Sequence, residues 1–102
     1  MKDLSEKEFK EFISKGNCAI DFWASWCGPC KMLGPVFDEI ESELSSIKFA
    51  KVNVDEAGDV PVEFGVRGVP TIILFKDGVE VNRIVGFIPK PALKAQIEEI
   101  FS

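Results

Sequence analysis

The sequence contains no histidine, and this absence excludes several kinds of chemistry. A cysteine nucleophile cannot be paired with an imidazole base, and a metal site cannot use histidine ligands. Cysteine is also scarce, since the chain has three, an odd number that fits poorly with a disulfide-stabilised scaffold. Cys–His catalysis, histidine-containing metal sites and a dense disulfide framework are therefore disfavoured.

Long apolar runs and excess positive charge are missing too. No stretch approaches the roughly 20 apolar residues of a membrane-spanning helix, so we expect no membrane partner. The N-terminal MKDLSEKEF has no apolar h-region, and we expect no signal peptide and a location in the cytoplasm, where thiols are kept reduced. Twelve basic and 17 acidic residues give a net charge of −5, which argues against nucleic acid as a partner.

Patterns of helix and strand alternate along the 102 residues, and 46% of the chain is hydrophobic. We find no repeat, linker or low-complexity tract, and expect one domain over residues 1–102. The predicted helices are 5–16, 28–44, 56–64 and 91–101. The predicted strands are 18–24, 47–55 and the two arms of a hairpin within 70–86, which turns at Asp77-Gly78.

Local signals fix the starts of two predicted helices. Ser5 and Glu8 have the spacing of a capping box, and Leu4 and Phe9 flank that cap as a hydrophobic staple. Asp55 is the candidate N-cap of the short helix that follows it.

The alternation of helices and strands predicts an α/β fold with a parallel core. The tight turn at Asp77-Gly78 makes the last strand pair antiparallel. We therefore expect a single mixed sheet with helices on both faces. Two cysteines, Cys27 and Cys30, fall just after the buried strand 18–24, at the start of a helix.

The position of the Cys27-Gly28-Pro29-Cys30 stretch has chemical consequences. A helix N-terminus carries free N–H groups and partial positive charge, so Cys27 should ionise more easily than an ordinary thiol. Cys30 follows about one turn later, within reach for a Cys27–Cys30 disulfide. Cys27 would attack a substrate disulfide, and Cys30 would resolve the mixed disulfide.

Other interpretations of the pair are a zinc site, a structural disulfide and a pair without a role. Zinc needs four ligands, and the chain offers only this pair and the distant Cys18, so we expect no metal. A structural disulfide that closes so short a loop would constrain little chain. A CxxC pair beside a βαβ pattern in a cytosolic protein is typical of redox chemistry.

The sequence resembles the thioredoxin family in DFWASWCGPCKM, KVNVDE, RGVPTIILFKDG and the later Val85-Gly86. These stretches come in the family's order over nearly the whole chain. The resemblance implies a thioredoxin fold, a mixed sheet of four or five strands flanked by four helices. Only MKDL precedes the first helix, so the first edge strand should be very short or absent.

The resemblance also implies a function, that of a thiol–disulfide oxidoreductase. It predicts a monomeric dithiol electron carrier without a cofactor, which reduces disulfides in client proteins and is re-reduced by a thioredoxin reductase. A disulfide oxidase or isomerase of the same fold, and a binding module independent of redox chemistry, are the alternatives.

Two charged residues each allow two interpretations. Asp21 is either satisfied by a partner near its strand end or buried, with its pKa raised by desolvation. The resemblance favours the second, with Asp21 beneath Cys30 as its proton acceptor. Lys51 is either solvated or, as the resemblance implies, a modulator of the ionisation of Asp21.

The resemblance further implies a substrate groove facing the cysteines. A cis peptide bond at Val69-Pro70 would let the backbone there pair with an extended client segment. Val85, Gly86 and Phe87 would line the same groove, where Phe87 could narrow it or make it more apolar.

Two further aromatic residues and one cysteine complete the predictions. The resemblance makes Trp26 a partly exposed platform beside Cys27, in the active-site loop with Gly28 and Pro29, and Trp23 a packing residue. Cys18 is either a core residue or a regulatory thiol.

Overall fold

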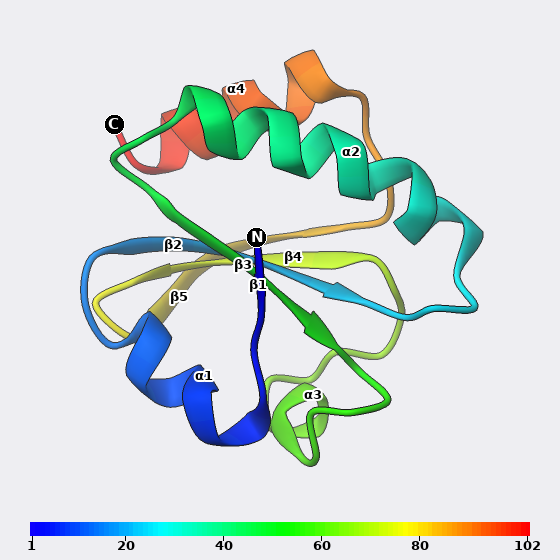
Figure 1. The fold of residues 1–102 in the computed structure, drawn as a ribbon. Coiled ribbons are helices and arrows are strands. Elements are labelled where there is room, and N and C mark those ends of the chain that lie inside the picture. The colour runs from blue at the N-terminus through cyan, green and yellow to red at the C-terminus, as the bar shows by residue number, and fades with distance from the viewer.

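The computed structural model describes residues 1–102 and contains five strands and four helices (Figure 1). No helix combines the length and the apolar character needed to cross a bilayer. The strands are β1 (Lys2–Asp3), β2 (Asn17–Trp23), β3 (Lys48–Asn53), β4 (Thr71–Lys76) and β5 (Val79–Val85). The helices are α1 (Glu6–Ile13), α2 (Gly28–Glu43), α3 (Val60–Glu63) and α4 (Lys90–Ile100).

The strands form one mixed sheet in the order β1-β3-β2-β4-β5. β3 is parallel to both of its neighbours, and β4 is antiparallel to β2 and β5. Helices α2 and α4 cover one face of the sheet, and α1 and α3 lie on the other (Figure 1). The predicted fold class is confirmed, including a first edge strand of only two residues.

Alternation along the central strand β2 sorts its side chains between the two faces. Cys18, Ile20 and Phe22 belong to the apolar cluster under α1 and α3. Ala19 belongs to the cluster under α2 and α4. Asp21, two residues further along the strand, therefore points to the face that α2 covers.

The predicted start of α1 is confirmed. Ser5 accepts a hydrogen bond from the Glu8 N–H, and the Glu8 carboxylate accepts one from the Ser5 N–H, which completes the capping box. Leu4 and Phe9 are both buried in the same cluster, as a hydrophobic staple requires. These contacts hold α1 against the sheet.

The predicted start of the third helix is wrong. Asp55 caps no helix, because its carboxylate accepts a hydrogen bond from the Trp26 indole at 2.9 Å. Gly58 then adopts a left-handed conformation at φ +58°, so the residues after Asp55 do not continue as a helix. The helix begins only at Val60, where Pro61 suits the first turn.

Candidate redox site

Cys27 and Cys30 form a disulfide at the N-terminus of α2, with their Cα atoms 5.3 Å apart. Cys27 is the N-cap of the helix, and its Sγ accepts a hydrogen bond of 3.2 Å from the Cys30 N–H. Gly28 and Pro29 form the exposed first turn. The positive end of the helix therefore acts directly on the Cys27 sulfur, which favours its thiolate form.

The chain before β4 faces the disulfide from the other side. The Val69 carbonyl oxygen lies 3.6 Å from the Cys27 Sγ, and the Val69–Pro70 peptide bond is cis. The Pro70 carbonyl accepts a hydrogen bond of 2.8 Å from the Gly86 N–H. A shallow groove of about 90 Å³ runs beside this segment and is lined by Trp26, Val54, Val66, Arg67, Gly68 and Val69.

Trp26 stands at the rim of the groove with 69% of its surface exposed. Its indole N–H donates to Asp55, a site residue that the sequence interpretation assigned to a helix cap instead. One signal could have found this contact. Trp26 follows β2 and Asp55 follows β3, and the carboxyl ends of neighbouring parallel strands meet at one edge of a sheet.

The residues after β5 divide between surface and core. Val85 is 68% exposed at the end of the strand, and Gly86 adopts a left-handed conformation at φ +88°. The Phe87 side chain is half-buried against the cluster under α2 and α4.

Asp21 is a buried carboxyl, with 3% of its surface exposed. Its Oδ1 has no hydrogen-bond partner, and burial raises the pKa to about 7 against the opposing charge of Lys51. A cavity of about 180 Å³ joins this carboxyl to the second cysteine and is lined by Asp21, Trp23, Cys30, Lys31, Gly34 and Lys51. The structure thus brings a carboxyl able to accept a proton at neutral pH to the cavity that Cys30 lines.

Lys51 lies opposite Asp21 in the register between β2 and β3. Its Nζ is 5.0 Å from the centre of the Trp23 ring, and the Trp23 indole donates to Asp3 at 3.3 Å. Lys51 is thus a half-buried residue whose ammonium lies over the Trp23 ring, on the strand next to Asp21. Its charge works against the burial that raises the pKa of Asp21.

Cys18 is a free thiol that the fold keeps away from this site. It lies near the start of β2, whereas Cys27 and Cys30 follow the end of that strand. The side chain is fully buried, and burial raises the pKa of the thiol. No group of three or more histidine, cysteine, aspartate or glutamate side chains is placed to hold a metal ion.

The family model and the relatives that match this chain all indicate the same family. The thioredoxin family model matches residues 1–99. The chain is 48% identical to a thioredoxin of Chlamydia caviae over 91% of both chains, and 51% identical to one of Mycoplasma pneumoniae over 78% of both. It is 40% identical to a thioredoxin of Listeria monocytogenes over 97% of both. The chain belongs to the thioredoxin family and is a thiol–disulfide oxidoreductase whose redox-active pair is Cys27 and Cys30.

Proposed function

We propose that the chain reduces disulfide bonds in client proteins as a dithiol carrier and that a thioredoxin reductase restores its dithiol form. The observation that carries the proposal is the unequal surroundings of the two sulfurs. Cys27 caps a helix N-terminus and lies against the Val69 carbonyl, whereas Cys30 lines a cavity that Asp21 also lines. These surroundings support attack by the Cys27 sulfur and activation of the Cys30 thiol by a base.

In the first step, the Cys27 thiolate attacks one sulfur of the client disulfide. A disulfide forms between Cys27 and the client, and the other client sulfur leaves as a thiolate that takes up a proton. The hydrogen bond from the Cys30 N–H and the helix dipole support this role, because both stabilise negative charge on the Cys27 sulfur.

In the second step, Cys30 gives its proton to Asp21 and attacks the Cys27 sulfur. The Cys27–Cys30 disulfide forms, and the second client sulfur leaves and is protonated, so the client has gained two electrons and two protons. The pKa of Asp21, about 7, suits a base at neutral pH, and Lys51 modulates it. Reduction by a thioredoxin reductase returns the pair to two thiols.

The proposed client-binding surface surrounds Cys27. An extended client segment pairs with the backbone at Val69 and Pro70, beside the Trp26 platform, and passes Val85 and Gly86. The exposure of Trp26 and Val85 supports this assignment. Phe87, which follows Gly86 and packs against the cluster under α2 and α4, would narrow this surface or make it more apolar.

We further propose that the chain acts in the cytoplasm, because a protein-disulfide reductant needs a compartment that keeps thiols reduced. Residues 1–102 would form one domain that works as a monomer and needs no bound cofactor.

Trapping of clients by a Cys30→Ser variant tests the proposal. Without the resolving thiol, we expect mixed disulfides that link Cys27 to client proteins and that dissolve on reduction. Cys27→Ser is the matched control and should trap nothing. Equal trapping by the two variants, or none by Cys30→Ser, would contradict the assigned roles.

A further inference from the structure

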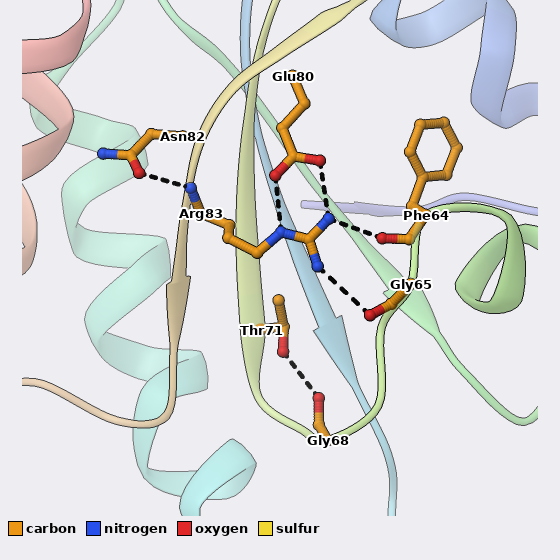
Figure 2. Close-up of polar contacts among 7 residues, drawn as sticks. All are labelled: Phe64, Gly65, Gly68, Thr71, Glu80, Asn82 and Arg83. Carbon is orange, nitrogen blue, oxygen red and sulfur yellow. Dashed lines mark hydrogen bonds and ion pairs between the residues drawn. The ribbon is translucent and has the colours of Figure 1, made fainter.

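The Arg83 side chain connects β5 to the end of α3 (Figure 2). Its Nη2 donates to the Phe64 carbonyl at 2.6 Å, and its Nη1 lies 3.4 Å from the Gly65 carbonyl. Its Nε and Nη2 also donate to the two carboxylate oxygens of Glu80, at 2.6 and 2.7 Å. All but one of the N–H groups of the guanidinium are therefore used.

A β-bulge makes this arrangement possible. The pairing of β4 with β5 shifts so that Leu74 lies opposite Asn82 and Phe75 opposite Glu80, which leaves Val81 as an extra residue. Residues three apart on a regular strand point to opposite faces, but one inserted residue brings them to the same face. Glu80 and Arg83 therefore share the face on which α3 lies.

The two carbonyls that Arg83 binds belong to residues that end a helix. Phe64 is the C-cap of α3, and Gly65 follows it in a left-handed conformation at φ +66°. The last carbonyls of a helix lack partners within the helix, and a basic side chain can satisfy them. Glu80 holds the guanidinium in one orientation, because a paired carboxylate and guanidinium form two parallel bonds.

The chain that starts at these carbonyls leads directly to the redox site. Within residues 65–70, Val66 to Val69 line the groove together with Trp26, and the Val69 carbonyl faces the Cys27 sulfur. At the end of this segment next to β4, the Thr71 hydroxyl donates to the Gly68 carbonyl at 2.7 Å (Figure 2). At the other end, next to α3, Arg83 anchors the segment through the Phe64 and Gly65 carbonyls.

We propose that Arg83 is a positioning residue for client binding. It fixes the start of the 65–70 segment and so preorganises the backbone that the client pairs with, while the chemistry of Cys27 stays independent of it. This inference rests on the function proposed above. Loss of the anchor would loosen the start of the segment, although the Gly65 and Val66 N–H groups would still donate to Val62 and Pro61, and the client would then have to order it on binding.

The test compares a protein client with a small disulfide. Arg83→Ala should raise KM for insulin disulfides about five- to tenfold and leave kcat unchanged, with a thioredoxin reductase in excess. The reduced variant should react with a small aromatic disulfide at the wild-type rate and with the wild-type pH profile. Amide hydrogen exchange should accelerate within residues 65–70.

Two further variants control for charge and for general stability. Arg83→Lys keeps the charge but loses the planar fork, and should give a smaller rise in KM. Lys90→Ala removes a cation of the same side-chain exposure, 31%, which pairs with Glu39 and Glu43 on α2. It should leave KM and exchange within residues 65–70 unchanged.

If the wild-type chain reduces insulin and Arg83→Ala has the same KM as the wild type, the role of Arg83 alone is overturned. Equal rises in Arg83→Ala and Lys90→Ala would also overturn it, since the effect would then follow general stability. A wild-type chain that fails to reduce insulin would overturn the proposed function, and the role of Arg83 with it.

Discussion

The two faces of the sheet are built differently. The cluster under α1 and α3 holds 12 buried residues, all apolar, with Phe9 at its centre in contact with three other aromatic rings. The cluster under α2 and α4 is of similar size, but beside it, on the same face, lies the unpartnered carboxyl of Asp21. One face is packed with apolar side chains, and the other also buries the carboxyl that we propose as the base for Cys30.

This difference indicates where a buried ionisable group can be accommodated in a small fold. A buried carboxylate without a partner costs free energy, so it is tolerated only where the rest of the structure compensates. The apolar cluster on the opposite side of the same strand, β2, is one source of that compensation. Truncation of the Phe9 ring on one face and neutralisation of the Asp21 carboxyl on the other should therefore have opposite effects on stability.

The largest expected effect is that of Phe9→Ala on the apolar face. Removal of this fully buried ring should lower the free energy of unfolding by about 3–5 kcal/mol, through lost contacts and a residual cavity. Denaturant unfolding of the oxidised protein measures it. Turnover per folded molecule should not change, and a parallel loss of turnover would contradict the division between the faces.

The opposite effect is expected for Asp21→Asn. Its pKa is about 7 in the folded chain against an ordinary 3.8, so the folded state keeps a proton that the unfolded state loses as pH rises. The wild type should lose stability between about pH 4 and pH 7, by up to about 4 kcal/mol. Below this range the ionisation has no effect, and above it the full loss persists.

The variant should lack this pH dependence. At pH 8 it should be more stable than the wild type by about 2–4 kcal/mol, and at pH 4 the two should be equal in stability. Unfolding curves at both pH values give the comparison. A variant that is less stable at pH 8 would show that the Asp21 carboxylate has a stabilising partner.

The smallest effect is expected at Cys18, on the apolar face. Cys18→Ala removes one buried sulfur and should cost about 1 kcal/mol. The native thiol, which is fully buried, should resist a thiol reagent that labels it at once after unfolding. Rapid labelling of the native protein would instead support a regulatory thiol.

Local patterns predicted most of the fold. The capping box at Ser5, the Asp77-Gly78 turn and the apolar run of β2 each act within a few residues, and all three appear as expected. Asp55 misled the prediction because a side chain far away in the sequence, Trp26, takes its carboxylate. Contacts of that kind leave no local pattern.

The site was predictable in part for the same reason. The motif located Cys27 and Cys30, and alternation along β2 explains why Asp21 faces α2. The bulge at Val81 was not predicted. The spacing of the apolar residues changes there, because Val79 and Val81 are two apart and exposed, whereas Ile84 is three residues further on and buried. Without the bulge, the contact between Arg83 and the end of α3 could not be foreseen.

The most direct test of this account is the pH dependence of the resolving step. A mixed disulfide between Cys27 and a client peptide is formed, and release of the second client thiol is followed in a single turnover. The wild-type rate should rise with pH and level off above about 7, as Asp21 loses its proton. Asp21→Asn should release the second client thiol more slowly at pH 7, and its rate should lack the rise that levels off above about pH 7. Identical profiles for the two proteins would contradict the assignment of Asp21 as the base for Cys30.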